Sequence, residues 1–254
     1  MKKVTPATSI VALTLLAILV LGCNIGKSST SSGSTSRDSK NSNSSSNSTT
    51  SSTSTSSATA PDIAGKYDLT GTNPDGGSYQ GTLEVITRGD VYQFRWNAGS
   101  QYDGIGVQNG KIVAVAYTTG ANGEGCGVVD YDIRGDGSLT GKWGYWGKNE
   151  AGTEDATRTR GSGLAGEYDG TGKNPNGTSY KVKISVEPAG SLYRFVWSNN
   201  TDGLGIKRGN NVAVGIGGSR CGFVMYEVKS DGSLDGVWGG GGSDKTGTEK
   251  AIRQ

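Results

Sequence analysis

The side chains in this sequence whose types and spacing best suit chemistry are carboxylates. The 254-residue chain has no histidine, which removes the commonest general base and the commonest metal ligand. Two carboxylate pairs recur, Asp103 with Glu154 and Asp202 with Glu249, and paired carboxyl groups can act as acid and base. However, each aspartate precedes a glycine, as in a turn, and each glutamate follows Gly-Thr near a strand end, where a glutamate is usually solvated or a cross-strand partner. We therefore expect no catalytic residue and no enzymatic activity.

Metal and phosphate chemistry is not expected either. Residues 130–132 and Asp136 supply three aspartates, but they lack the spacing of a calcium-binding loop, and the second half has Met225 in place of the first of them. The Gly-x-Gly triplets at 104–106 and 203–205 lack the following helix that a dinucleotide-binding loop needs. The sequence thus predicts no metal site and no cofactor.

The sequence contains an internal duplication, and the recurring carboxylate pairs belong to it. Residues 64–71 and 92–96 recur as residues 165–172 and 193–197 with the same spacing of aromatic side chains, which indicates a small unit in tandem. In each copy, apolar residues alternate with polar ones between glycine-rich turns, a pattern typical of short antiparallel strands. The residues predicted to face inward are Leu83, Val85, Tyr92, Phe94, Trp96, Val113, Val115, Tyr117, Val129, Tyr131, Ile133, Leu139, Trp143, Ile184, Val186, Tyr193, Phe195, Trp197, Val212, Val214, Val224, Tyr226, Val228, Leu234 and Trp238.

The strand pattern predicts an all-β protein with two tandem antiparallel up-and-down β-barrels of about eight short strands each. The Gly-Lys-Tyr opening at residues 65–67, with the meandering strands that follow, resembles the small barrels of the avidin and lipocalin superfamily. Residues 67–79 and 168–180 share the pattern Tyr-x-x-Thr-Gly-x-Asn-Pro-x-Gly-x-x-Tyr, and each copy closes on Gly-Thr-Glu. This pattern is similar to a repeat in bacterial exported proteins often labelled fibronectin-binding, and that label implies adhesion to host matrix.

The N-terminal segment predicts export. Two lysines precede an apolar run at residues 10–21 that is short for a membrane-spanning helix. The run ends in Val-Leu-Gly-Cys, which resembles the lipobox of bacterial lipoprotein precursors and implies lipidation of Cys23; an ordinary signal peptide is the alternative. Asn24 follows the cysteine, and the resemblance then implies a location at the outer membrane or cell surface. Membrane contact is therefore expected through a lipid anchor at Cys23.

Composition indicates the domain boundaries. Residues from about 28 to 60 are almost wholly serine, threonine and asparagine, a composition that predicts a disordered tether. Such a tether would hold the folded part of the chain away from a lipid surface. The expected organisation is a signal peptide at 1–22, a lipidated tether at 23–61, one barrel at 62–160 and a second barrel at 161–254.

Two further cysteines, Cys126 and Cys221, lie at equivalent points of the two copies. In an oxidising compartment such residues either pair or stay as buried thiols. Strand alternation turns both outward, and Phe223 and Met225 turn outward beside Cys221, which indicates that one barrel wall packs on the other. We therefore expect a disulfide between Cys126 and Cys221.

Three aromatic residues of the first copy have no aromatic counterpart in the second. Tyr145 and Trp146 fall near a hairpin end where the second copy has glycine, and Tyr117 aligns with Ile216. Aromatic residues near loops often serve recognition, and local packing is the alternative. We predict a ligand-binding site built from Tyr145, Trp146 and Tyr117.

Two functional hypotheses follow. The first is a non-enzymatic surface lipoprotein that binds a protein or glycan, such as a host matrix protein; the second is a carrier that holds a small ligand inside a barrel. The rings predicted to face inward are large enough to fill barrels of this size, which favours adhesion. A net charge of +2 without basic runs argues against nucleic acid as a partner. The sequence does not indicate an oligomeric state.

Overall fold

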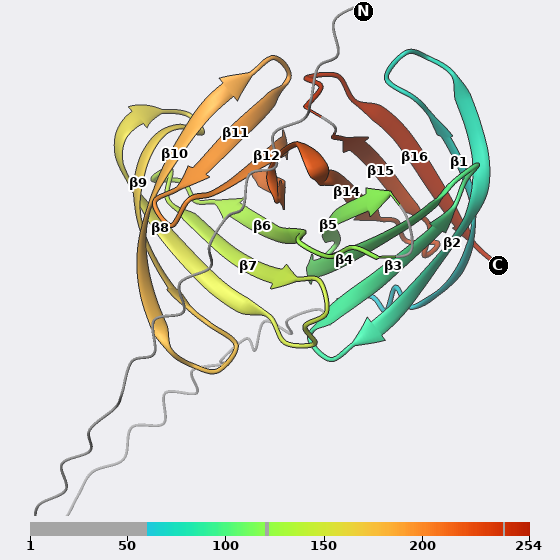
Figure 1. Cartoon of the computed structure of the whole chain (residues 1–254), viewed down its shortest axis with the longest axis horizontal. Coiled ribbons are helices and arrows are strands. Elements are labelled where there is room, and N and C mark those ends of the chain that lie inside the picture. The colour runs from blue at the N-terminus through green and yellow to red at the C-terminus, as the bar shows by residue number, and fades with distance from the viewer. Residues whose placement is uncertain (1–59, 120–121, 241) are drawn as a thin grey trace, which may run out of the picture. The chain divides into compact units, whose positions relative to one another are not determined.

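The structure, a computed structural model, describes residues 60–119, 122–240 and 242–254; the lipobox with Cys23 and nearly all of the expected tether lie outside them. The described residues form two closed, eight-stranded antiparallel β-barrels, as predicted (Figure 1). They contain no helix long and apolar enough to cross a membrane. The strands are β1 (Gly65–Thr72), β2 (Ser78–Arg88), β3 (Val91–Asn97), β4 (Gln101–Asn109), β5 (Ile112–Thr119), β6 (Gly127–Ile133), β7 (Leu139–Tyr145), β8 (Gly152–Ser162), β9 (Ala165–Lys173), β10 (Ser179–Ala189), β11 (Leu192–Trp197), β12 (Thr201–Arg208), β13 (Asn211–Ile216), β14 (Gly222–Val228), β15 (Leu234–Gly239) and β16 (Gly247–Arg253).

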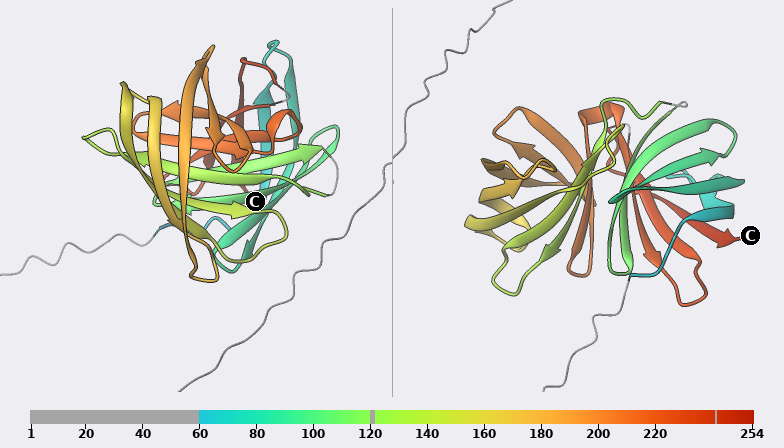
Figure 2. Two further views of the ribbon diagram at one scale, coloured as in Figure 1. Left: turned by 60° about the vertical axis from the view of Figure 1, so that its left-hand side comes forward. Right: turned by 90° about the horizontal axis from the view of Figure 1, so that it is seen from below.

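The two barrels do not coincide with the two sequence repeats. One, here the continuous barrel, consists of the successive strands β6 to β13, whereas the other, the split barrel, combines β1 to β5 with β14 to β16. Along the chain, the continuous barrel thus comes between β5 and β14, which pair with each other in the split barrel (Figure 2). The expected division into one barrel at 62–160 and another at 161–254 therefore differs from the structure, in which each barrel takes strands from both repeats.

The exchange occurs at two strand pairs. β5 pairs with β14, where Tyr117 lies opposite Gly222, and β13 pairs with β6, where Ile216 lies opposite Gly127. Because the repeats are alike, β14 presents to β5 the same kind of edge that β6 would present. The repeat pattern alone therefore does not distinguish the exchanged pairing from one barrel per repeat.

The alternation of apolar and polar residues correctly predicts the barrel interiors. Every residue predicted to face inward lies in or against the apolar cluster of one of the two barrels. One end of each interior is closed by an apolar residue that precedes the first strand of a repeat. The Tyr67 hydroxyl donates to the Ile63 carbonyl at 2.7 Å, and the Tyr168 hydroxyl donates to the Leu164 carbonyl at 2.7 Å. Both Ile63 and Leu164 are buried and belong to the interior clusters.

The outer walls of the barrels pack against each other through a third apolar cluster, the inter-barrel cluster. Phe223 and Met225 are fully buried there, which confirms that these outward residues are covered by the other barrel wall. The cluster consists of Val91, Ile105, Val107, Ala114, Ala116, Cys126, Val128, Leu192, Ile206, Ala213, Cys221, Phe223 and Met225. The barrels are therefore joined by a buried apolar contact as well as by the chain.

The predicted disulfide between Cys126 and Cys221 is confirmed, with a Cα–Cα distance of 5.8 Å. Cys126 immediately precedes β6, where the chain enters the continuous barrel, and Cys221 immediately precedes β14, where the chain returns to the split barrel. The bridge thus joins the two segments at which the chain passes between barrels. Both cysteines are buried in the inter-barrel cluster.

We expect replacement of both cysteines by alanine to lower the free energy of unfolding by about 3 kcal/mol, because the disulfide closes a long loop in the unfolded chain. Cys126 and Cys221 are 95 positions apart in the sequence. Chemical denaturation of the double variant, compared with a Cys23→Ser control, measures this difference. Equal stability of the double variant and the control would contradict the stabilising role.

The inter-barrel contact also contains one carboxyl group without a partner. Asp130 on β6 is fully buried, and neither of its carboxylate oxygens has a hydrogen-bond partner among the described residues. Its neighbour Asp132 accepts a hydrogen bond from Asn109 at 2.8 Å. Burial first, and then the charge of Asp132, raise the pKa of Asp130 to about 7. The nearby Asn109 side chain lowers this pKa, but by less than burial and charge raise it. The equivalent position in the second repeat is Met225. Only one of the two barrels therefore contributes a carboxyl group at this position of the contact.

Candidate binding cavities

The interior of each barrel contains one buried glutamate. Glu249 on β16 faces the split barrel and Glu154 on β8 faces the continuous barrel, with exposed fractions of 6% and 5%. Of the two expectations for these glutamates, exposure to solvent is therefore wrong, whereas contact with neighbouring strands is correct. In each strand the glutamate lies two residues after a buried glycine and two before a buried alanine, so strand alternation turns it inward.

In the split barrel, three neutral donors hold Glu249. Its Oε1 accepts hydrogen bonds from the Trp96 indole at 3.0 Å and from the Tyr226 hydroxyl, and its Oε2 accepts one from the Tyr79 hydroxyl at 2.8 Å. The Trp96 indole also approaches the Tyr226 hydroxyl oxygen at 3.2 Å. These side chains come from β2, β3, β14 and β16, so the carboxylate links strands of both repeats across the interior.

The continuous barrel repeats the arrangement. Glu154 Oε1 accepts from the Trp197 indole at 3.1 Å and from the Tyr131 hydroxyl, and Oε2 accepts from the Tyr180 hydroxyl at 2.9 Å. The Trp143 indole additionally donates to the Tyr180 hydroxyl at 2.9 Å. In the split barrel the equivalent Trp238 indole N–H is buried and has no partner among the described residues.

The donors favour an ionised carboxylate, which accepts hydrogen bonds without donating any. The pKa of Glu249 is raised above the ordinary glutamate value by burial, and the hydrogen bonds from Tyr226, Trp96 and Tyr79 make that rise smaller. Burial, followed by the charge of the nearby glutamate, raises the pKa of Tyr226 and that of Tyr131 well above the ordinary tyrosine value. These phenols therefore stay protonated and act as donors, and they do not serve as bases.

Each barrel has a cavity beside its glutamate. The cavity of the split barrel has a volume of about 290 Å³ and that of the continuous barrel about 310 Å³. The first lies at the end where β1 leads into the turn at Asn73, opposite the end closed by Ile63. Its lining residues are Asn73, Tyr79, Trp96, Ala98, Gly99, Ser100, Tyr102, Tyr117, Val224, Trp238 and Glu249. The lining of the second is Val129, Tyr131, Trp143, Tyr145, Glu154, Asn174, Tyr180, Lys181, Val182, Trp197, Asn199, Thr201 and Ile216.

The structure separates the three aromatic residues predicted to form one site. Tyr117 lines the cavity of the split barrel, and Tyr145 lines the cavity of the continuous barrel. Trp146 packs against the inter-barrel cluster and covers Gly123, where a Cβ would lie 2.5 Å from its ring. The three side chains therefore do not share one surface, and two of them belong to separate cavities.

Tyr117 and Tyr145 occupy comparable places in the two barrels. The Tyr117 ring lies over Gly222 on the neighbouring strand and the Tyr145 ring lies over Gly127, where an added Cβ would come within 2.4 Å and 2.5 Å of the rings. Any larger residue at either glycine would displace a ring. Both tyrosines belong to the first repeat, yet strand exchange gives one to each barrel.

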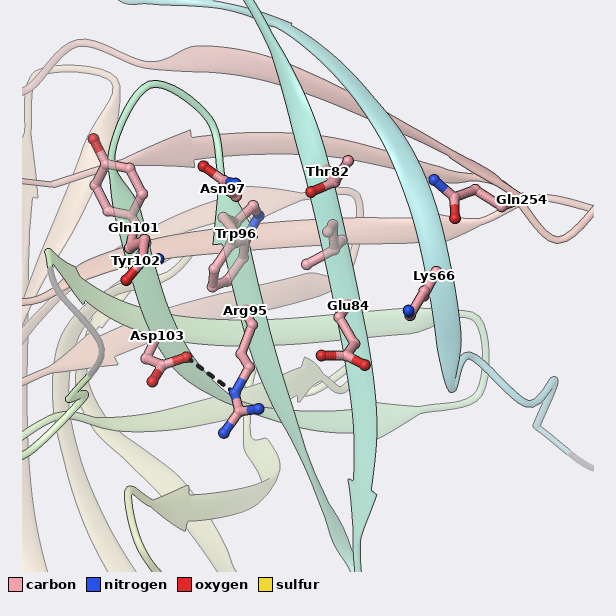
Figure 3. A pocket seen from close by; sticks show the side chains of 11 residues that line it. Lys66, Thr82, Glu84, Arg95, Trp96, Asn97, Gln101, Tyr102, Asp103 and Gln254 are labelled. Atoms are coloured by element: carbon pink, nitrogen blue, oxygen red, sulfur yellow. Dashed lines mark ion pairs between the residues drawn. The ribbon is translucent and has the colours of Figure 1, made fainter.

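A larger groove of about 600 Å³ follows the outer wall of the split barrel (Figure 3). Its charged side chains form a row across four neighbouring strands, in which Lys66 is opposite Glu84, Glu84 is opposite Arg95, and Arg95 is opposite Asp103. Arg95 and Asp103 form an ion pair at 3.7 Å. Alternating charges at directly opposed positions stabilise a sheet, so we assign this groove a structural role.

The carboxylate pairs considered for acid-base chemistry are not brought together. Asp103 is on β4 of the split barrel, whereas Glu154 is inside the continuous barrel; Asp202 and Glu249 are likewise on different barrels. Asp103 and Asp202 also lie within strands and not in turns, and Asp202 forms an ion pair with Arg194 at 3.2 Å. Among the residues that the structure describes, no group of three or more histidine, cysteine, aspartate or glutamate side chains is placed to hold a metal ion.

The cavity glutamates and their donors were missed by reasoning from the sequence. The available signal was the phase of Gly-x-Glu-x-Ala in β8 and β16, which places the glutamate on the same face as the buried alanine. No family model matches this chain, and no similar protein was found among curated sequences or solved structures. The cavities are therefore interpreted from their own geometry.

Proposed function

We propose that the protein binds small molecules in the cavities of its two barrels. The observation that carries this proposal is the cavity of about 300 Å³ beside a buried glutamate in both barrels. Ligand sites are typically concave, lined by aromatic and apolar groups, and equipped with a few fixed polar groups. A volume near the lower end of the usual range of roughly 300–1,000 Å³ suits a small ligand.

The position of the rings supports binding inside the barrels. From the sequence, the inward rings were expected to fill the interiors, which favoured adhesion. In the structure Trp96 and Tyr79 instead donate hydrogen bonds to Glu249, and a cavity remains beside them. The residues on which a recognition surface was predicted are dispersed, so adhesion to a protein or glycan has no specific support from the fold.

Display at the bacterial outer membrane or cell surface remains part of the proposal. It rests on the lipobox-like sequence before Cys23 and on the Ser/Thr/Asn-rich segment that follows. Both would place the barrels outside the membrane to which the lipid is attached, where a small ligand can reach them.

The test uses N-phenyl-1-naphthylamine, a neutral aromatic probe whose fluorescence rises in apolar sites. We expect saturable binding, with one site in each barrel. Ala98→Trp places a ring at the mouth of the split barrel, and Asn199→Trp does so at the mouth of the continuous barrel. Each variant should remove one site, and the combination should remove both. Unchanged binding by a folded double variant would contradict the proposal.

A further inference from the structure

The cavity of the split barrel differs from an ordinary apolar pocket in its charge. Among the described residues, its lining includes five large aromatic side chains and a single charged residue, Glu249, with no lysine or arginine. The aromatic lining residues are Tyr79, Trp96, Tyr102, Tyr117 and Trp238. A bound molecule would therefore meet aromatic rings and one negative charge.

The charge of Glu249 has no cationic partner among the described residues. All three of its hydrogen-bond donors are neutral indole or phenol groups, and none of the ion pairs in the described chain includes it. Neutral donors stabilise a buried carboxylate but leave its net charge in place. A positively charged ligand would supply the missing partner.

The lining rings pack against one another in tilted and edge-to-face pairs. The centroid of the Tyr117 ring lies 5.8 Å from that of the Trp96 ring, with 56° between the ring planes. It lies 5.9 Å from the centroid of the Tyr102 ring, with 79° between the planes. The ring centroids of Tyr79 and Trp238 lie 6.3 Å apart, with 70° between the ring planes. Rings at steep angles can present faces as well as edges to one enclosed group. The negative faces of aromatic rings attract ammonium groups, most strongly where water is excluded.

We propose that the cavity of the split barrel binds a small organic cation of the quaternary or alkylated ammonium class. This inference rests on the proposed function, because it names the ligand chemistry of one of the two cavities. Glu249 supplies the opposite charge, and the rings supply cation–π contacts and a surface for the alkyl groups. An alkylated ammonium loses less hydration on entering such a site than a primary ammonium does, which suits a mostly aromatic lining.

The continuous barrel is a natural comparison. Its cavity keeps the glutamate and has the Tyr145 ring over the equivalent glycine, but Ile216 occupies the repeat-related position of Tyr117, and Lys181 is part of the lining. The positive charge of Lys181 acts against a cationic ligand there. We therefore assign the preference for cations to the split barrel.

The experiment compares choline with 3,3-dimethylbutan-1-ol, its uncharged carbon analogue of nearly the same shape, by isothermal titration calorimetry. We expect choline to bind the wild-type protein at least roughly tenfold more tightly, about 1.4 kcal/mol. Glu249→Gln should abolish this preference, whereas Glu187→Gln, at an exposed position of β10 outside both cavities, should leave it unchanged. Tyr117→Ile, which gives the split barrel the residue of the continuous one, should weaken choline binding more than binding of the alcohol.

The outcomes separate the two proposals. Equal affinities for choline and the alcohol, or no binding of choline by a protein that still binds N-phenyl-1-naphthylamine, would overturn the cation proposal and leave the general one in place. A preference that persists in a folded Glu249→Gln variant would also overturn it. If neither choline nor the neutral probe binds, the proposed function itself fails. Thermal unfolding of each variant shows whether it is folded. If Glu249→Gln does not fold, the comparison of choline with the alcohol in Tyr117→Ile tests the cation proposal.

Discussion

Glu249→Ala is expected to lower the free energy of unfolding by about 3 kcal/mol, since each buried donor left unpaired costs about 1–3 kcal/mol. The substitution removes the acceptor of the Tyr226 hydroxyl group and the nearer acceptor of the Tyr79 hydroxyl group, which keeps only the Thr248 carbonyl at 3.4 Å, while the Trp96 indole keeps the Tyr226 oxygen at 3.2 Å. It also removes a connection between strands of the two repeats. Urea denaturation measures the change.

Three controls show whether the hydrogen bonds cause this effect. Glu249→Gln should cost less than half as much, because its carbonyl oxygen still accepts from Trp96 and Tyr226 and its amide can donate to the Tyr79 oxygen. Glu154→Ala should cost about as much as Glu249→Ala, because the continuous barrel has the same donors. Glu187→Ala, at an exposed position of β10, should have little effect. If Glu249→Ala is as stable as Glu187→Ala, the network does not stabilise the barrel.

Asp130 is expected to make the protein less stable as the pH rises. Its pKa in the folded protein is about 7, above the ordinary value of 3.8, because the carboxyl group is buried between the barrels. The folded state therefore holds a proton that the unfolded state has lost. This contribution is complete below about pH 4 and is lost as the pH rises through 7. A shift of about three units corresponds to about 4 kcal/mol.

The measurement is the difference in unfolding free energy between wild type and Asp130→Asn from pH 4 to pH 8. Asparagine does not titrate, so the variant should become more stable than wild type as the pH rises. Asp130→Met, which copies Met225 from the other side of the contact, should behave similarly. Asp155→Asn changes an exposed carboxyl group on β8 and serves as the control. A pH-independent difference between Asp130→Asn and wild type would show that Asp130 does not change its protonation in this range.

Local patterns were sufficient to predict the barrels, because burial of one strand face imposes a period of two. The large inward side chains, such as Phe94 and Phe195, occupy the predicted interiors. The disulfide was also predictable, because two outward cysteines beside outward apolar residues imply a covered wall. Each of these inferences depends on neighbours within one strand or on matching positions of the repeats.

Strand exchange was not predictable in the same way. β5 can pair with β6 of its own repeat or with β14 of the other, and the two edges are alike in sequence. The choice depends on how the chain crosses between barrels near Cys126 and Cys221 and on the contacts of the inter-barrel cluster. These are long-range properties that a repeat pattern does not report.

The candidate sites illustrate the same limit. Tyr117 and Tyr145 were correctly recognised as differences between the repeats, but their separation into two cavities follows from the exchange. The sequence interpretation of Glu154 and Glu249 was a solvated residue or a cross-strand partner, because both fall near predicted strand ends. Their burial depends on tyrosine and tryptophan donors that come from other strands.

The most direct test of the account is to locate a bound ligand. Crystals with open barrel mouths, soaked with 5-bromoindole, would reveal the bromine through its anomalous scattering. We expect bromine peaks inside the barrels, beside Trp96 and Glu249 in one and beside Trp197 and Glu154 in the other. Peaks confined to the outer walls, or no peak in either cavity at saturating ligand, would contradict the conclusion that the barrels are small-molecule-binding sites.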